Sequence, residues 1–117
     1  MAKVLVLAYS PLSHDPRVLR HVRELNKQHE VTTVGFGRLP IFVQDSVDIS
    51  RSQDRVNHMS EAALLVTGRY RQFLRKRFNE DVIFEALGRR RFDLVVANDV
   101  ETLPMALELA GAAPVWL

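Results

Sequence analysis

The sequence predicts an α/β fold: a Rossmann-like, doubly wound, mainly parallel sheet with helices on both faces. Two strand-like segments, residues 3–9 and 92–97, are almost continuously apolar, which is typical of parallel strands covered on both faces. Strand-like and helix-like segments alternate along the chain, as they do in such sheets. With 117 residues, 47% of them hydrophobic, the chain is large enough for one domain with a buried core.

The N-terminal third predicts a strand–helix–strand unit. Residues 3–9 form the first strand, and Asp15-Pro16 marks a helix start, because aspartate caps helices and proline lacks only an N–H that the first turn leaves unpaired. The helix ends near Gln28, and residues 30–36 supply the second strand. The apolar residues of the helix form one stripe, made of Val18, Leu19, Val22 and Leu25.

The middle of the chain is less regular. A weak alternation at residues 46–49 indicates a short edge strand. From Val56 to Leu87, apolar residues recur at three- and four-residue steps, which predicts one long helix or two helices joined near residues 79–81.

The C-terminal part predicts a strand, a turn, a helix and the start of another strand. Residues 92–97 form the third buried strand, and a polar turn follows. Residues 103–110 form a helix with Thr102 as its cap, and a last strand begins at Pro114.

Composition excludes several kinds of chemistry. The chain has no cysteine, so disulfides, thiolate zinc sites and cysteine nucleophiles are excluded. His21, His29 and His58 show no metal-ligand spacing, so no metal site is expected. The chain lacks an apolar run of about 18 residues and a signal-peptide pattern, which predicts a cytoplasmic protein.

Three segments carry a resemblance to a known family. The first is Asp15-Pro16-Arg17-Val18 at a helix start, followed by the strand His29-Glu30-Val31-Thr32. The second runs from Phe92 to Pro104, where a strand ends in Asn98-Asp99 before a Leu-Pro helix start, and the third is Ala113 to Leu117. In this order and spacing, the segments resemble the N-terminal domain of family-4 retaining glycosyltransferases.

This resemblance implies a GT-B architecture, in which two Rossmann-like domains face each other across a cleft. Residues 1–117 would be the N-terminal, acceptor-side domain, with the donor-binding domain beyond Leu117 and the isolated domain inactive. The enzyme would move a sugar from a nucleotide sugar to the hydroxyl of an acceptor sugar, glycolipid or small molecule. Transfer would need neither a metal nor a cofactor.

One departure from the family concerns the loop after the first strand. Many relatives carry glycines there, which let backbone N–H groups approach a donor phosphate. Residues 10–14 contain no glycine, and Asp15 would compete with an anion at the helix N-terminus. We therefore do not expect this loop to bind a phosphate.

The candidate binding residues follow two strands, because ligands of parallel sheets bind beyond the carboxyl ends of the strands. Arg17 in a first helical turn opposes the helix dipole, so Asp15, Asp99 or an acidic substrate group is expected to hold it. Asp99 can orient sugar hydroxyls; the alternative is that Asp99 and Thr102 only cap the next helix. The full set of substrate-binding candidates is Ser10, His14, Arg17, Asn98, Asp99 and Glu101, with no catalytic residue assigned.

The positive charge is concentrated in one stretch. From Arg51 to Phe92 there are ten Lys and Arg against five Asp and Glu, although the whole chain carries only +2. A solvated helix face is one interpretation; the other is a peripheral membrane contact. A nucleic-acid partner is not expected, because no recognition helix or interleaved aromatic residues accompany the charge. The contact would use Arg69, Arg71, Arg75, Lys76 and Arg77.

Two other function classes remain open at this level. A sugar-nucleotide epimerase shares the two-domain form, but its typical Gly-Thr-Arg-Pro-Glu opening is absent. A stand-alone Rossmann-like or flavodoxin-like module would bind a small molecule or a protein, but neither an acidic pair nor Gly-x-Gly-x-x-Gly follows the first strand. Apolar surface left at the last strand further predicts that the isolated domain dimerises or aggregates.

Overall fold

The computed structural model describes residues 2–37, 39, 43, 45–49, 78 and 80–117. Two 3-10 turns, η1 (Leu12–His14) and η3 (Val100–Thr102), accompany the regular elements. In chain order these are β1 (Lys3–Pro11), α1 (Pro16–Asn26), β2 (Glu30–Phe36), β3 (Asp45–Asp48), α4 (Glu80–Leu87), β4 (Leu94–Ala97), α5 (Leu103–Ala110) and β5 (Val115–Trp116).

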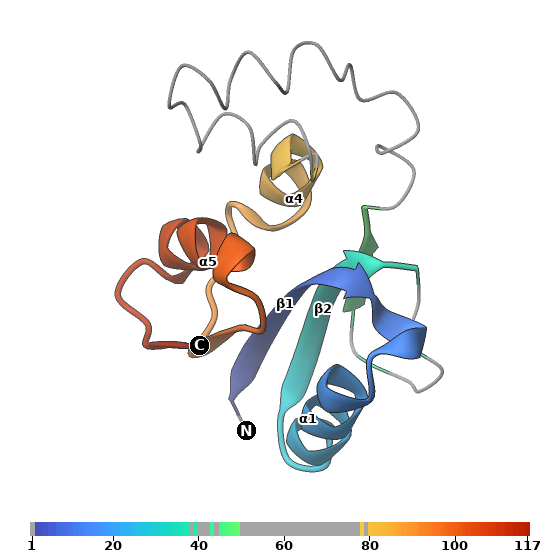
Figure 1. Cartoon of the computed structure of the whole chain (residues 1–117). Helices are drawn as coiled ribbons and strands as arrows, with labels where there is room; N and C mark the ends of the chain where they lie inside the picture. The colour runs from blue at the N-terminus through green and yellow to red at the C-terminus, as the bar shows by residue number, and fades with distance from the viewer. Residues whose placement is uncertain (1, 38, 40–42, 44, 50–77, 79) are drawn as a thin grey trace, which may run out of the picture.

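The described strands form one five-stranded sheet in the order β3-β2-β1-β4-β5 (Figure 1). Every neighbouring pair is parallel. The chain leaves β1 toward β2 on one side and returns on the other side as β4, so the strand order reverses between β1 and β4. The protein therefore has a mixed α/β fold with an all-parallel sheet, consistent with a Rossmann-like arrangement.

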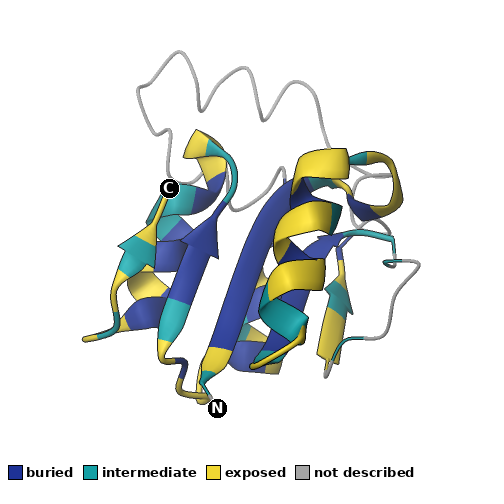
Figure 2. Ribbon diagram, turned by 90° about the horizontal axis from the view of Figure 1, so that it is seen from below, coloured by how far each residue is buried: buried dark blue, intermediate teal, exposed yellow. Residues whose placement is uncertain are grey.

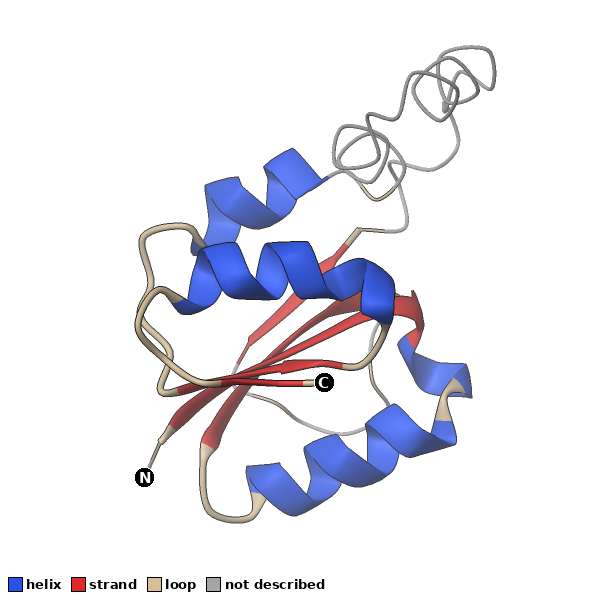
Figure 3. Ribbon diagram, turned by 60° about the vertical axis from the view of Figure 1, so that its left-hand side comes forward, coloured by secondary structure: helices blue, strands red, loops and turns tan. Residues whose placement is uncertain are grey.

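Helices pack on both faces of this sheet (Figure 3). Side chains of a strand point alternately to its two faces. On β1, Val4 and Val6 join the core that contains α1, whereas Leu5 and Leu7 join the core that contains α4 and α5. Figure 2 shows that the central strands are buried. Two-sided burial explains why β1 is apolar at successive positions rather than at alternate ones.

Most predicted elements have close counterparts. β2 and α5 have the predicted bounds, α1 ends two residues earlier, and β3 lies one residue earlier at the edge of the sheet. β4 is shorter than predicted, since it begins at Leu94, although Phe92 is buried in the core. α4 begins at Glu80, where a junction between two helices was predicted. The rest of the predicted long helix, with all five basic residues of the membrane hypothesis, lies outside the described residues.

The start of α1 is capped as predicted. The Asp15 Oδ1 accepts a hydrogen bond from the backbone N–H of Val18, at 3.3 Å, and Pro16 occupies the first turn. We expect Asp15→Ala to lower the free energy of unfolding by about 0.5–2 kcal/mol, because one N–H of the first turn loses its acceptor. Urea unfolding followed by circular dichroism measures this change, and Asp15→Asn, which keeps a capping oxygen, should recover most of it.

No helix in the described part of the chain combines the length and the apolar character that crossing a membrane requires.

Candidate functional site

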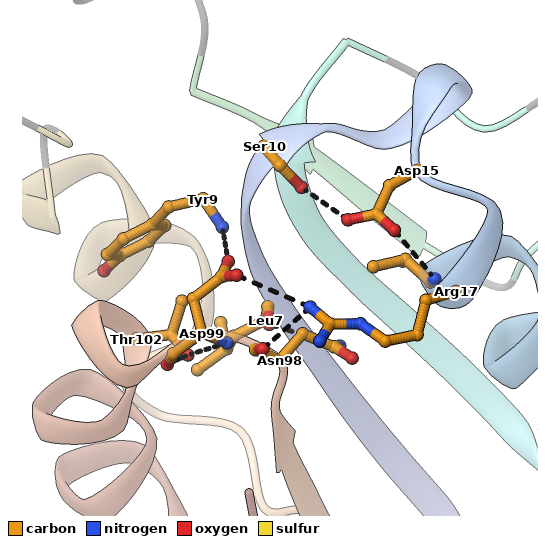
Figure 4. A network of polar contacts seen from close by, with 9 residues as sticks. Leu7, Tyr9, Ser10, Asp15, Arg17, Asn98, Asp99 and Thr102 are labelled. Carbon is orange, nitrogen blue, oxygen red and sulfur yellow. Dashed lines mark hydrogen bonds and ion pairs between the residues drawn. The ribbon is translucent and has the colours of Figure 1, made fainter.

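A cluster of polar groups lies at the carboxyl ends of β1 and β4. Its members are Tyr9 at the end of β1, Arg17 in the first turn of α1, and Asn98 and Asp99 directly after β4 (Figure 4). We call these four residues the switch-point cluster, because they lie where the strand order reverses. In open parallel sheets, this is the position at which ligands bind.

Asp99 joins the ends of the two strands through its carboxylate. Its Oδ2 accepts a hydrogen bond from the backbone N–H of Tyr9 at 2.9 Å, and its Oδ1 lies 3.6 Å from Nη2 of Arg17. The side chain is 29% exposed, so it remains accessible to a ligand. Asp99 therefore does more than cap the next helix.

Thr102 does not cap α5 with its side chain, which corrects the prediction. Its hydroxyl instead donates to the backbone oxygen of Asp99 at 2.6 Å, and its backbone N–H donates to the same oxygen at 3.0 Å. The reason is the 3-10 turn η3, which places Thr102 three residues after Asp99 and within reach of it. These bonds fix the backbone from which the Asp99 carboxylate extends.

Arg17 reaches across the sheet edge from α1 to the loop after β4. Its Nη2 donates to the backbone oxygen of Asn98 at 3.0 Å, and the same nitrogen faces Asp99. These two acceptors offset the unfavourable position of a cation at a helix N-terminus. The Arg17 side chain is 58% exposed. Its guanidinium carries five N–H groups, more than the contacts with Asn98 and Asp99 occupy.

Asn98 holds the loop against β1 rather than pointing toward solvent. Its backbone N–H donates to the oxygen of Leu7 at 2.9 Å, and its side-chain Nδ2 approaches the same oxygen at 3.4 Å. The backbone bond continues the pairing of β1 with β4 by one residue beyond Ala97, and the side-chain bond adds a second link to the same oxygen. Asn98 therefore offers Arg17 a backbone acceptor whose position is well fixed.

The other predicted residues lie outside these contacts. The Ser10 hydroxyl donates to Asp15 Oδ2 at 3.2 Å, so it supports the cap of α1 at the edge of the site (Figure 4). His14 is exposed, and its Nδ1 pairs with the Ser13 hydroxyl at 2.9 Å, outside the switch-point cluster. Glu101 is exposed on η3 and makes none of the contacts of the switch-point cluster.

A buried hydrogen-bonded pair, Tyr9 and Glu80, lies next to the switch-point cluster and was not predicted from the sequence. The hydroxyl of Tyr9 donates to Oε2 of Glu80, whose residue is fully buried, and the Tyr9 ring stacks on Phe78 with centroids 4.1 Å apart. Glu80 follows a polar stretch in the sequence, which indicates a surface position. Its partner is 71 residues away, so no local pattern could identify the pair.

Close packing fixes the loop between β1 and α1. The Leu12 side chain is fully buried in the core under α1, and it lies over Gly35 of β2. A Cβ atom at position 35 would stand 2.6 Å from the Leu12 side chain and 2.8 Å from the backbone oxygen of Ala8. Glycine is therefore required at position 35 for the loop to approach the sheet this closely.

The switch-point cluster can interact with a ligand through hydrogen bonds and through ionic attraction. The carboxylate of Asp99 accepts, and the guanidinium of Arg17 donates. Among the described residues, no group of three or more His, Cys, Asp or Glu side chains could hold a metal ion. The arrangement suits the orientation of a polar ligand at the sheet edge.

Comparisons of the chain with family models, with curated proteins and with solved structures give no match. The assignment of a function therefore depends on the geometry of the switch-point cluster and on the sequence resemblance.

Proposed function

We propose that this chain is the acceptor-side domain of a GT-B glycosyltransferase, which transfers a sugar from a nucleotide sugar to an acceptor hydroxyl. In this proposal the sheet is one doubly wound half of the enzyme. The observation that carries the proposal is the switch-point cluster, where Asp99 and Arg17 meet at the ligand-binding edge of a parallel sheet.

Asp99 and Arg17 can each form further hydrogen bonds with a ligand. A carboxylate accepts about four hydrogen bonds, and Asp99 uses its oxygens for the Tyr9 N–H and for Arg17. A sugar hydroxyl can donate to Asp99 while its oxygen accepts from Arg17. Such a pair of bonds would fix the direction of the hydroxyl lone pair, and fixed orientation is a large contributor to the rate of group transfer.

The donor diphosphate would be bound elsewhere. The Asp15 carboxylate already accepts from the N-terminus of α1, and the loop of residues 10–14 has no glycine through which backbone N–H groups could reach a phosphate. The second domain would therefore supply the groups that stabilise the leaving diphosphate. The resemblance to family-4 glycosyltransferases supports the same division.

The test is a transfer assay on the two-domain protein, with UDP-glucose, UDP-N-acetylglucosamine and GDP-mannose as donors. We expect Arg17→Gln to lower kcat/KM about tenfold or more, because a charged hydrogen bond to the acceptor is lost. Its stability should change by less than about 1 kcal/mol, since exposed ion pairs contribute little.

The matched control is Arg23→Gln, which removes an exposed arginine from the last turn of the same helix. Arg23→Gln should leave kcat/KM unchanged. Equal effects of the two substitutions would contradict the proposal, and so would a coding sequence that supplies no donor-binding domain after Leu117.

A further inference from the structure

A buried carboxyl group with no part in the proposed reaction lies next to the switch-point cluster. Glu80 is fully buried in the first turn of α4, and its Oε2 accepts a hydrogen bond from the Tyr9 hydroxyl. Burying these polar groups is costly, and a pair of apolar side chains of the same shape can be about as stable. What the hydrogen bond adds to packing is direction, because it fixes where the Tyr9 ring lies.

Strand pairing does not fix the backbone at Tyr9. The last residue of β1 that pairs with β4 is Leu7, opposite Ala97. On the other side, the register of β1 against β2 shifts between Leu7 and Pro11. The backbone between these two residues is therefore held less closely by its neighbours than the centre of β1 is, and the Tyr9 side chain becomes its anchor.

The Tyr9 side chain is held by a stack and by a hydrogen bond. Its ring lies nearly parallel to that of Phe78, with centroids 4.1 Å apart and 18° between the planes. Two stacked rings can slide over each other, because the contact is weakly directional within the plane. The bond from the hydroxyl to Glu80 stops this movement, because it fixes the far end of the ring.

The backbone N–H of Tyr9 carries this anchoring to Asp99. The Tyr9 ring extends away from Asp99, whereas its N–H points at the Asp99 carboxylate and donates to Oδ2 at 2.9 Å (Figure 4). Nη2 of Arg17 lies 3.6 Å from Oδ1, which is longer than a hydrogen bond, and the Arg17 side chain is exposed. The direction of the Asp99 carboxylate therefore depends mainly on the position of the Tyr9 N–H.

We propose that Glu80 and the Tyr9 hydroxyl position Asp99 for the reaction. Glu80 holds the Tyr9 ring, the ring fixes the end of β1, and the Tyr9 N–H directs the Asp99 carboxylate toward the acceptor hydroxyl. This inference rests on the proposed function, in which Asp99 orients that hydroxyl. Tyr9 and Glu80 are both buried, so their side chains do not contact the acceptor. Their loss should lower the rate of transfer more than the affinity for the acceptor.

A double substitution separates positioning from stability. Tyr9→Phe alone removes a donor from the buried Glu80, and Glu80→Met alone removes the acceptor of a buried hydroxyl, so either change destabilises the fold. The combination replaces both polar groups by apolar ones of similar size and keeps the stack on Phe78. In urea, the unfolding midpoint of the double variant should lie closer to that of the unmodified chain than the midpoints of the single variants do.

Amide hydrogen exchange, measured by NMR, reports on the Tyr9 N–H directly. In the double variant we expect the amide of residue 9 to exchange about tenfold faster, because its bond to Asp99 opens more often. The amide of Val6, within the paired part of β1, should exchange at an unchanged rate. Equal acceleration at both residues would show that the pair only stabilises the fold and would overturn the inference. No acceleration at residue 9 would also overturn it.

Transfer by the two-domain protein tests the consequence for the reaction. We expect the double variant to lower kcat about tenfold while the KM for the acceptor changes less than about twofold. Glu80→Gln keeps an oxygen that can accept from the Tyr9 hydroxyl, so it should retain most of the activity. The matched control is Asp81→Asn, an exposed carboxylate in the same turn of α4, which should change neither kcat nor KM. A fully active double variant would overturn the inference.

The two measurements also separate this inference from the proposed function. Faster exchange confined to residue 9, with an unmodified two-domain protein that transfers no sugar, would support the placement of Asp99 by the pair and contradict the proposed function. Transfer by the unmodified protein, with unchanged exchange at residue 9 in the double variant, would support the proposed function and overturn the inference.

Discussion

Asp99→Asn is expected to lower kcat/KM for sugar transfer about a hundredfold and to leave the fold intact. Asparagine keeps one oxygen, which can still accept from the Tyr9 N–H, but it loses the charge that faces Arg17 and one acceptor for the sugar hydroxyl. Misplacing a reacting group by about 1 Å can lower the rate about 10²-fold. Steady-state kinetics of the two-domain protein with saturating donor measure this effect.

Asp99→Ala should add a loss of stability to the loss of transfer. Alanine removes the acceptor of the Tyr9 N–H at the end of β1, so we expect the free energy of unfolding to fall by about 1–3 kcal/mol. The control is Glu85→Gln, an exposed carboxylate on α4. If Asp99→Asn retained full activity while Asp99→Ala was only destabilised, Asp99 would have a structural role alone.

Gly35→Ala is expected to lower the free energy of unfolding by about 1–3 kcal/mol, which is the usual cost of overpacking a core. The added methyl group would stand 2.6 Å from the Leu12 side chain and 2.8 Å from the backbone oxygen of Ala8. Leu12 has no free space, because it is fully buried under α1, and the Ala8 oxygen is fixed by the strand. Urea unfolding measures the change.

The same substitution should disturb the site, because Leu12 anchors the loop between β1 and α1. We expect Gly35→Ala to reduce kcat/KM together with stability, whereas the combination with Leu12→Ala should recover part of the activity by making room. Gly37→Asn serves as the control, since nothing lies near position 37 and asparagine tolerates its positive φ of 77°. A Gly35→Ala variant as stable as the unmodified chain would contradict this account of the loop.

The sequence by itself determined the elements whose signals are local. β2 and α5 lie at the predicted residues, and Asp15 caps α1, because side-chain periodicity and capping depend on neighbours within one or two turns of the chain. The unbroken apolar run of β1 also indicated burial on both faces. From these elements alone, the polar residues after β1 and β4 could be placed at one edge of a sheet.

Only the tertiary structure decided which of those residues meet. Arg17 contacts Asn98 and Asp99 across more than 80 positions of sequence, while His14 and Glu101, equally plausible by position, remain apart from them. The physical reason is that β1 and β4 are joined by long-range pairing, which no periodicity encodes. Glu80 of α4 is likewise buried against Tyr9, from which it is separated by 71 residues of sequence.

The strand order sets β4 beside β1 on the side away from β2, so the loop after β4 lies within reach of Arg17 in the first turn of α1. Local sequence therefore specified the strands and helices, and the order of the strands specified the site.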